Sequence, residues 1–353
     1  MPVDADVLVI GGGAIGASVG YFVKLLDPGA EVAVVERDPA YTLASTPRAS
    51  GGVRRLFSLP ENVELSKYSI GFFAGFPAAM AVDGVPADIG WHKNGYLFIV
   101  PPSGLGVLRR NFDLQQQRGC RVDWLDPDEL AGRFPSMNVA DEVTGLVRQG
   151  HRITAVRLAS GGLVGAAHVV NAAGAWAKEI CAMIDVPVPI EPMRRYEHYF
   201  ECQDPIEPLP YLKDTARLAF RPEGAGYSGG VPSLDEPRGY AFGVDNGYFE
   251  RAVWPALAHR FPKFERTKCL RTLPGLYDQN DFDGNAIIGP GAGGLGNFHM
   301  LAGFSGHGLM HAPGCGRAMA ELLLTGGYQT IDLARFGWQR LADGTPLREQ
   351  GIL

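Results

Sequence analysis

The stretch Asp6-Val-Leu-Val-Ile10-Gly11-Gly-Gly13-Ala14-Ile15-Gly16 reads as a buried strand that passes through a glycine turn into a helix. Gly11 makes the turn, Gly13 lets the backbone approach a pyrophosphate, and Gly16 lets the helix pack closely on the strand. Such a turn presents the free amides of a helix N-terminus to a diphosphate. The stretch therefore predicts a dinucleotide-binding site.

An acidic residue at the end of the next apolar run strengthens this prediction. Residues 31–36 form a second strand-like run, and Glu36 follows Gly16 by twenty residues. A carboxylate at this place grips the ribose hydroxyls of an adenine dinucleotide. The alternative is a glycine-rich turn that binds nothing, but strand, turn, helix, strand and acid occur here in the order that binding requires.

The composition is that of a globular protein. Charged residues make up 20% and apolar residues 46% of the 353 residues, and the net charge is −6 with acids and bases interspersed. Because no basic block occurs, nucleic acid and anionic membrane surfaces are not expected as partners. No apolar run is long enough to span a bilayer, and the chain enters its first strand without a cleavable leader, so we expect a cytoplasmic protein.

The cysteines and histidines indicate no metal. The five cysteines are scattered, which is typical of neither a disulfide framework nor a zinc cluster. His307 and His311 stand four residues apart, a spacing that could chelate a metal, but no third ligand follows at a useful distance. We therefore expect no metal site.

Two further stretches have the composition of ligand-lining segments. A polar loop after the second strand contains Ser45, Thr46, Ser50, Gly51 and Gly52. A buried strand that ends at residue 171 leads into small residues, and there we predict a second cofactor contact by Ala173, Gly174 and Trp176.

The C-terminal part returns to the nucleotide-binding layer. A strand and a glycine turn, Gly303-Phe304-Ser305-Gly306-His307-Gly308-Leu309, open a long helix. The amides of that helix N-terminus are predicted to point at an electron-rich ring edge. Between the two glycine turns the chain is rich in predicted strands, such as residues 193–200 and 216–221, and residues 246–260 predict an amphipathic helix.

Taken in order, these motifs resemble the D-amino-acid-oxidase-like superfamily of FAD-dependent oxidoreductases, which includes glycine oxidase, sarcosine oxidase and dimethylglycine dehydrogenase. Within it, the chain is similar to bacterial imino-diacid and N-alkyl amino-acid oxidases and to mitochondrial FAD-dependent oxidoreductase-domain proteins linked to respiratory-complex assembly. The resemblance implies an α/β fold, with a Rossmann-like FAD-binding domain of the glutathione-reductase type and an interleaved substrate domain of antiparallel sheet plus helix. The FAD-binding domain would comprise residues 1–85, 135–185 and 270–353, and the substrate domain residues 86–134 and 186–269.

The resemblance also implies roles along the cofactor. The first turn, with Gly11, Gly13, Ala14, Ile15 and Gly16, would cradle the pyrophosphate. Glu36 would hold the ribose, Arg37 would lie near the adenine, and Val143 would meet the adenine through its backbone. The phosphates would touch Ser45 and Thr46.

At the redox end, residues 50–54 would run beside the isoalloxazine. Gly174, with Ala173 and Trp176, would pack near the ribityl chain. Residues 303–309 would face the pyrimidine end of the flavin, where a helix N-terminus stabilises the anionic reduced ring.

Three departures from the family pattern change what we expect of flavin attachment, of the electron acceptor and of one helical unit. Gly275 stands where covalent sarcosine oxidases have a flavin-linked cysteine, so we expect non-covalent FAD. The lysines of those oxidases are replaced at Met310 and within residues 226–230, which puts oxygen as electron acceptor in doubt. The helical unit that relatives have between the equivalents of Ala140 and Asp141 is absent, which indicates a deletion or a segment left out at this junction.

The chemistry expected is removal of hydride from the carbon beside an amine nitrogen. The protein then has to hold the substrate, and an arginine fork for its carboxylate could come from Arg54, Arg55, Arg195 or Arg221. Other candidate catalytic residues are Tyr277, His307, and the pair Tyr196 and His198, which share one face of a predicted strand. The alternative for the pair is a packed tyrosine and a satisfied histidine inside a sheet.

The leading hypothesis is thus an FAD-dependent oxidase or dehydrogenase for a secondary-amine or N-substituted amino acid, with oxygen or another redox partner as electron acceptor. A second hypothesis is a flavoprotein assembly or scaffold factor with little catalysis of its own. A third, NAD-linked dehydrogenation, is disfavoured by the C-terminal glycine motif. The sequence specifies neither the amine nor the oligomeric state.

Overall fold

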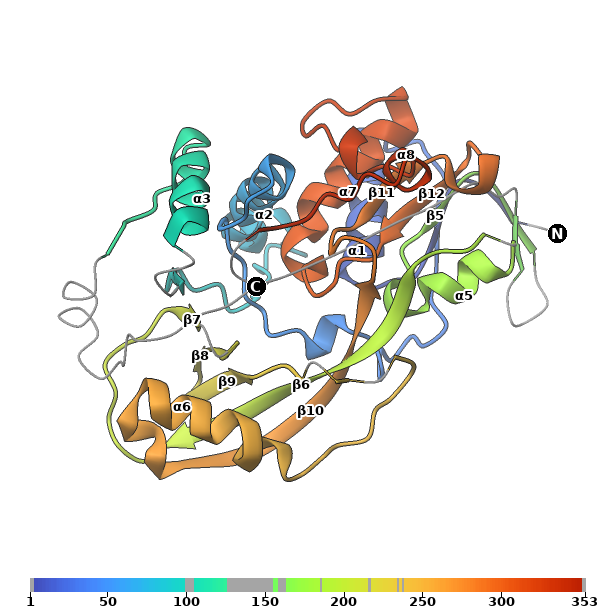
Figure 1. Ribbon diagram of the computed structural model, residues 1–353. Helices are drawn as coiled ribbons and strands as arrows, with labels where there is room; N and C mark the ends of the chain where they lie inside the picture. The colour runs from blue at the N-terminus through green and yellow to red at the C-terminus, as the bar shows by residue number, and fades with distance from the viewer. Residues whose placement is uncertain are drawn as a thin grey trace.

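A computed structural model describes residues 3–98, 105–125, 155–157, 163–184, 186–214, 217–233, 235–236 and 238–350. It contains two six-stranded sheets with helices packed on them, which confirms the expected α/β architecture (Figure 1). The two long strands β6 (Ile190–Cys202) and β10 (Thr267–Asn280) belong to the second sheet and extend toward the first.

The first sheet has the order β11-β12-β5-β1-β2, with β4 paired to β5. Strands β12, β5, β1 and β2 are parallel, whereas β11 and β4 are antiparallel to their neighbours. The strands are β1 (Val3–Ile10), β2 (Val32–Val35), β4 (Ala155–Arg157), β5 (Leu163–Asn171), β11 (Ile287–Pro290) and β12 (Phe298–Ala302). This is the nucleotide-binding sheet that the first glycine turn predicts.

Helices cover both faces of the first sheet, which explains why β1 is an uninterrupted apolar run. On one face, Val7 and Val9 pack with α1 (Ala14–Leu26) and α7 (Gly308–Thr325). On the other, Leu8 and Ile10 pack with α5 (Ala177–Ala182). Close packing of α1 on α7 requires glycine at residue 316, because a Cβ there would lie 2.5 Å from Ser18 Cβ.

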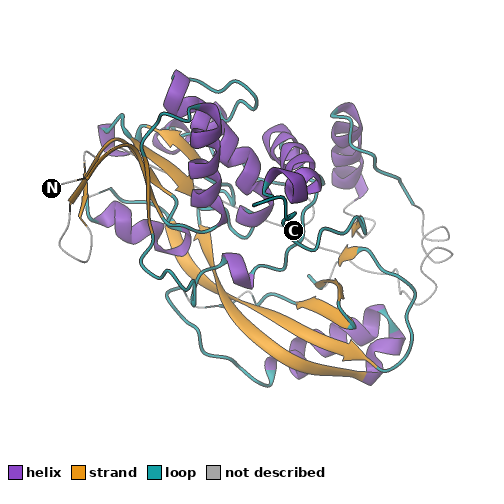
Figure 2. Ribbon diagram, turned by 180° about the vertical axis from the view of Figure 1, so that it is seen from behind, coloured by secondary structure: helices purple, strands orange, loops and turns teal. Residues whose placement is uncertain are grey.

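The second sheet has the order β10-β6-β9-β8-β7-β3 and is antiparallel except between β3 and β7. Its remaining strands are β3 (Tyr96–Phe98), β7 (Tyr211–Lys213), β8 (Ala219–Glu223) and β9 (Gly226–Gly230). One face packs on α6 (Trp254–Arg260) through a phenylalanine cluster that includes Phe200 and Phe220 (Figure 2). The other face is turned toward the first sheet.

The remaining helices lie outside the two sheets. Helix α2 (Pro60–Ala79) packs on α7, and α3 (Leu105–Gln117) and α8 (Gln339–Ala342) lie nearer the surface. The helix expected at residues 246–260 consists of a π-helical turn, Phe249–Val253, followed by α6. Short 3-10 turns occur at Thr46–Arg48, Gly174–Trp176, Pro262–Arg266, Ala292–Gly294 and Ala334–Phe336.

Interleaving of the two units is confirmed, because the second sheet takes its strands from residues 96–98 and 190–280 while the first takes strands from both ends of the chain. The residue bounds of the two domains stay a prediction. Among the described residues no helix is both long and apolar enough to cross a membrane. The cytoplasmic location likewise stays a prediction.

A buried ion pair ties α6 to the second sheet. Arg260 Nε lies 2.8 Å from Asp214 Oδ2, and neither side chain is exposed to solvent. Asp214 Oδ1 also accepts a hydrogen bond from the backbone amide of Leu218 at 3.1 Å. Removing one member of such a pair leaves the other charge buried and uncompensated.

We therefore expect Asp214→Ala to lower the free energy of unfolding by about 3–5 kcal/mol, measured by urea denaturation followed by circular dichroism. The matched control is Asp204→Ala, which removes the partner of Arg266 in a solvent-exposed pair. That change is expected to cost less than about 1 kcal/mol. Equal losses for the two variants would contradict a structural role for the buried pair.

Candidate active site

A cavity of about 770 Å³ lies between the first glycine turn and the second sheet. Ligand pockets commonly have roughly 300–1,000 Å³. Every predicted cofactor residue lines this cavity except Gly16, Gly303 and Val143, and the last of these lies outside the described residues. The structure thus brings together segments that are far apart in the sequence.

The first turn has the geometry that its glycines predict. Gly11 has φ +101°, and a Cβ there would lie 2.5 Å from the carbonyl oxygen of Ala172. A Cβ on Gly16 would lie 1.9 Å from the carbonyl oxygen of Gly11, so Gly16 acts behind the cavity by letting α1 approach the turn. Gly13 provides no side-chain cap, and the Ala14 amide donates to Thr46 Oγ1 at 3.0 Å. The amides of Ile15 and Gly16 precede the first intrahelical hydrogen bond and are available to an anion.

Backbone hydrogen bonds hold Glu36 at the end of β2. Gly12 N–H donates to Glu36 Oε2 and Asp38 N–H donates to Oε1, each at 2.9 Å. In the adjoining wall, the guanidinium of Arg37 lies 3.9 Å above the Trp176 ring. The carboxylate and the Arg37–Trp176 stack therefore line the same end of the cavity, as expected for the adenine half of a dinucleotide.

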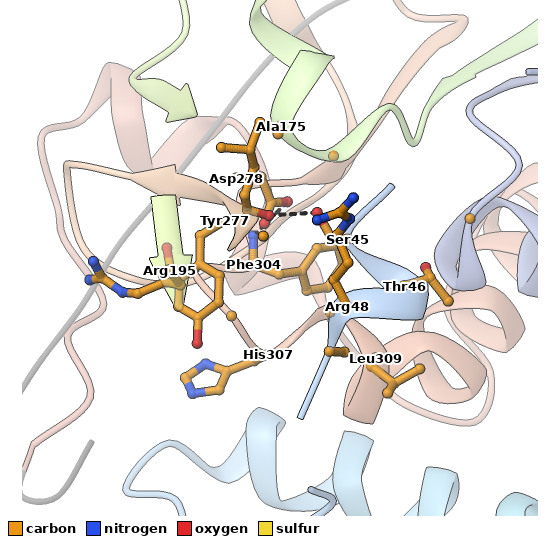
Figure 3. Close-up of a pocket in the computed structure, with 18 of the residues that line it drawn as sticks. Ser45, Thr46, Arg48, Ala175, Arg195, Tyr277, Asp278, Phe304, His307 and Leu309 are labelled. Carbon is orange, nitrogen blue, oxygen red and sulfur yellow. Dashed lines mark hydrogen bonds between the residues drawn. The ribbon is translucent and has the colours of Figure 1, made fainter. Parts of the chain in front are cut away.

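The second glycine turn is held by a buried carboxylate. Asp278 Oδ2 accepts hydrogen bonds from the amides of Gly303 at 2.7 Å and Phe304 at 3.0 Å. Burial raises the pKa of Asp278 to about 6, although these amides favour its charged form. The hydrogen bonds place Gly303 behind the wall, and the following residues face the cavity (Figure 3).

Beyond this turn, α7 begins without a side-chain cap. Gly306 has φ +98°, and a Cβ there would lie 2.5 Å from the Tyr277 ring. The helix starts at Gly308, and His307 at its N-terminal boundary makes no capping hydrogen bond. The free amides and the positive end of the helix dipole are therefore available at the cavity, near Tyr277 and His307 (Figure 3).

Arg54 places a buried charge in the cavity wall. Its side chain is buried, and Nη2 donates to His307 Nε2 at 3.1 Å. Within the described part of the chain, Nε and Nη1 have no hydrogen-bond partner and no carboxylate pairs with the guanidinium. Burial, and then the positive charge of Arg54, lower the pKa of His307 well below its ordinary value, so His307 is neutral and accepts through Nε2.

The two faces of β6 divide differently from the prediction. His198 is completely buried on the α6 side, where its ring contacts Tyr248 and Phe249. Tyr196 lies at the cavity edge, but its ring contacts His198 and its hydroxyl donates to the Gly243 carbonyl at 3.0 Å. The structure therefore leaves His198 outside the cavity lining and keeps Tyr196 at its edge.

The alternate residues of β6, Arg195 and Glu197, also line the cavity. We call this side of the second sheet its pocket face. Strand periodicity defines two faces but does not say which one meets a ligand, so the expected pair is divided: His198 does not line the cavity, whereas Tyr196 does and its catalytic role stays a prediction. Arg195 donates to the carbonyls of Arg194 and Ser233, at 3.2 and 3.4 Å.

The pocket face also contributes aromatic walls. The rings of Tyr96 and Tyr211 stack with centroids 4.7 Å apart, and Tyr277 lines the cavity from β10. A Cβ on Gly52 would lie 2.0 Å from the Tyr96 hydroxyl oxygen, so the polar loop packs directly on this stack. Tyr277 was predicted, whereas Tyr96 and Tyr211 were missed because they come from strands whose pairing no local pattern reveals.

The other predicted arginines lie outside the cavity lining. Arg55 does not line it, and Arg221 donates to the Ser50 carbonyl and pairs with Glu223. Two charged residues that sequence reasoning missed, Glu197 and Lys213, do line it. Their signal was the alternation along β6 and β7, which becomes informative only once the pocket face is known.

Comparison with known proteins agrees with this geometry. The sequence profile described as FAD dependent oxidoreductase matches residues 6–141 and 138–322. The chain belongs to this family of FAD-dependent oxidoreductases. The match decides against the alternative of a nicotinamide dinucleotide.

Individual relatives extend over the whole chain. FAD-dependent oxidoreductase domain-containing protein 1 of Bos taurus is 34% identical, over 100% of this chain and 88% of the relative. Mitochondrial sarcosine dehydrogenase of Mus musculus is 26% identical over 92% of this chain, but the match covers 40% of that protein. The solved structure of L-proline dehydrogenase from P. horikoshii has a TM-score of 0.79 at 24% identity, over 98% of this chain and 100% of that one.

The cavity of this FAD-dependent oxidoreductase fits the cofactor by its own chemistry. The remaining free amides at the start of α1 would face the pyrophosphate, and Glu36, which lines the same cavity, would hold the ribose. The uncapped start of α7 is available to the flavin ring. All five cysteines belong to the described residues and none of them lines the cavity, which is compatible with the non-covalent FAD that we propose.

The comparison with relatives bears on the helical unit that is absent at the junction of Ala140 and Asp141. The two matched stretches of this FAD-dependent oxidoreductase meet at residues 138–141. The alignment with the bovine relative spans 427 positions, whereas this chain has 353 residues, so the relative carries residues without a counterpart here. The junction of Ala140 and Asp141 lies outside the described residues, and the deletion at that point stays a prediction.

Flavin content tests the first turn. In Gly16→Ala the new Cβ would meet the Gly11 carbonyl oxygen at 1.9 Å, which displaces α1 from the turn. We expect the purified variant to lose most of its flavin absorbance near 450 nm relative to protein absorbance. The control is Gly71→Ala in α2, where a Cβ meets nothing within 4 Å, and it should retain its flavin. A fully loaded Gly16→Ala protein would contradict the assignment of the turn.

The pocket carboxyl of Glu197 makes stability depend on pH. Burial raises the pKa of Glu197 from 4.5 to about 7, although a hydrogen bond from Ser228 Oγ at 2.7 Å favours the charged form. At a pH between 4.5 and about 7, Glu197 holds a proton in the native protein but has lost it in the unfolded chain. Stability therefore falls as the pH rises through this window.

Between pH 5 and 7 we expect the free energy of unfolding of the FAD-loaded protein to fall by on the order of 1 kcal/mol, as measured by thermal unfolding. Glu197→Gln should remove this fall. Glu250→Gln is the control, because Glu250 is exposed and lies outside the cavity. An unchanged pH slope in Glu197→Gln would show that Glu197 is not the titrating group.

Proposed function

We propose that this FAD-dependent oxidoreductase oxidises the C–N bond of a secondary-amine or N-substituted amino acid. The observation that supports this most directly is Arg54, a buried guanidinium that has no carboxylate partner among the described residues and faces the cavity. A buried, uncompensated charge is strongly unfavourable, so the site is built for an anionic ligand group. An amino-acid carboxylate provides that group and matches a guanidinium fork.

The other side chains of the cavity suit the rest of such a substrate. Tyr96, Tyr211 and Tyr277 form an aromatic enclosure that excludes water from the carbon to be oxidised. Glu197 offers a carboxyl whose pKa near neutrality allows it to hold the substrate nitrogen through a hydrogen bond and to accept its proton. When bound, FAD supplies the acceptor for a hydride equivalent, which leaves an imine that water hydrolyses.

The names of two relatives agree with this substrate class. Sarcosine and proline, the substrates named for the dehydrogenases that this chain resembles, are both secondary-amine amino acids. Neither name identifies the amine or the electron acceptor of this chain. We propose either oxygen or a separate redox partner as the acceptor.

The test is an anaerobic screen of amino and imino acids, in which loss of the 450 nm flavin absorbance reports reduction, followed by admission of air. Bleaching by secondary amines supports the proposal, and the rate of recolouring in air separates an oxidase from a dehydrogenase. If the bound flavin stays oxidised with every amine, the proposal fails. That result would favour the alternative of an assembly or scaffold factor.

The role of Arg54 has a separate test. Charge-assisted hydrogen bonds contribute about 1.5–3 kcal/mol each, so we expect Arg54→Met to raise the substrate concentration for half-maximal anaerobic reduction by roughly 10- to 100-fold. The control is Arg55→Met, since Arg55 is adjacent but does not line the cavity. Unchanged half-saturation in Arg54→Met would exclude Arg54 as the carboxylate ligand.

A further inference from the structure

The loop that carries Arg54 has no regular secondary structure. Residues 50–57 belong to no helix or strand. Within the described part of the chain, the one backbone-to-backbone hydrogen bond of this loop joins the Phe57 amide to the Arg55 carbonyl. The orientation of Arg54 therefore depends on contacts that side chains from elsewhere make with the loop.

Two such contacts hold the ends of the loop. At Ser50, Arg221 donates to the backbone carbonyl and Tyr211 donates to the hydroxyl oxygen. At the other end, Glu349 Oε2 accepts hydrogen bonds from the backbone amide of Ser58 at 2.6 Å and from its hydroxyl at 2.5 Å. The second contact comes from a residue 291 positions further along the chain.

Glu349 also caps helix α2. The residue before this helix is Leu59, whose side chain makes no capping hydrogen bond. Glu349 Oε1 accepts hydrogen bonds from the Leu59 amide at 3.3 Å and from Asn62 Nδ2 at 2.8 Å. A carboxylate at a helix N-terminus satisfies free amides and is favoured by the helix dipole. One side chain thus fixes both the start of α2 and the end of the Arg54 loop.

The segment that carries Glu349, residues 343–350, is itself anchored. The Leu347 amide donates to Asp283, and Asn285 Nδ2 donates to the Leu347 carbonyl at 2.7 Å. Asp283 is buried and pairs with Arg340 at 3.0 Å. Glu349 is therefore presented to the loop from a fixed base.

Phe57 connects the Glu349 contact to the guanidinium. Its ring centroid lies 4.5 Å from Arg54 Cζ, and the ring packs edge-on against His307 with centroids 5.3 Å apart. Phe57 directly precedes Ser58, so a displacement of Ser58 moves the ring on which the guanidinium lies. Glu349 lines the cavity, but among the described residues it forms no ion pair with Arg54.

We propose that Glu349 is a positioning residue, which holds Arg54 in the orientation that binds the substrate carboxylate. This rests on the proposed function and adds to its site a residue from the far end of the sequence. Glu349 acts through Ser58 and Phe57, since its own carboxylate is occupied by four hydrogen-bond donors.

The alternative role for Glu349 is that of a counter-charge. Burial lowers the pKa of Arg54, and the carboxylate of Glu349 is near enough to act against this shift. The two roles predict opposite changes in affinity. Loss of a counter-charge strengthens the binding of an anion, whereas loss of the positioning contact weakens it, because fewer molecules then hold Arg54 in the competent orientation.

The test is a titration of (methylthio)acetate, a carboxylate with sulfur in place of the amine nitrogen, into the FAD-loaded protein. The change in the flavin absorbance spectrum gives Kd. In Glu349→Ala we expect Kd to rise about tenfold, which corresponds to a competent fraction of about one tenth. Glu349→Gln keeps one acceptor oxygen and should raise Kd less. In an Arg54→Met background, Glu349→Ala should change Kd by less than about twofold.

Two controls separate positioning from a general structural role. Asp343→Ala removes an exposed carboxylate from the same segment, where it accepts a hydrogen bond from Gln339, and should leave Kd unchanged. The limiting rate of anaerobic flavin reduction, measured with an amine that bleaches the flavin, should stay within about twofold in Glu349→Ala. If Glu349→Ala is isolated without flavin, Glu349→Gln is carried through the same comparison with and without Arg54.

Tighter binding in Glu349→Ala, or equal losses with and without Arg54, would overturn the positioning role. A lower limiting rate with unchanged Kd would overturn it as well. If (methylthio)acetate leaves the flavin spectrum of the unchanged protein unaltered and no amine reduces the flavin, the proposed function itself fails.

Discussion

The hydrogen bonds from Gly303 and Phe304 to the Asp278 carboxylate join β10 of the second sheet to the second glycine turn. The geometry of the site depends on them. Burial raises the pKa of this carboxyl, while the two amides favour its charged form. Tyr277, the residue before Asp278 on β10, lines the cavity. Because α7 begins five residues after Gly303, the same contacts also set where the helix N-terminus lies relative to the second sheet.

The cofactor is expected to be held mainly by the backbone at both ends of the cavity. Neither Gly13 before α1 nor His307 before α7 makes a side-chain cap. Apart from the Ala14 amide, which donates to Thr46, the first amides of both helices are available to electron-rich groups. The glycines at these turns are required by close approach, as the position of Gly16 against the Gly11 carbonyl shows. Backbone recognition leaves the side chains of the second sheet available for the substrate.

The charged residues of the cavity differ in how they are paired. The carboxylates of Glu36 and Asp278 are occupied by amides, and they serve the cofactor turns. Arg54 and Lys213 have no carboxylate among the described residues, and both lie where the second sheet meets the polar loop. An unpaired buried cation is tolerated where a ligand supplies the opposite charge. The arrangement therefore carries information about the substrate that the cofactor motifs do not contain.

The sequence by itself determined the cofactor site, because glycine turns, strand ends and helix starts are local features whose spacing follows from backbone geometry. Residues of both glycine turns, Glu36 and residues of the polar loop all line one cavity, and their contacts to FAD stay a prediction. Which face of β6 lines the site was decided only by the tertiary structure, since a strand alternates its side chains but the packing of α6 selects the face. Tyr96, Tyr211 and Lys213 became part of the site only through the pairing of β3, β7 and β8, a long-range register that no local pattern specifies.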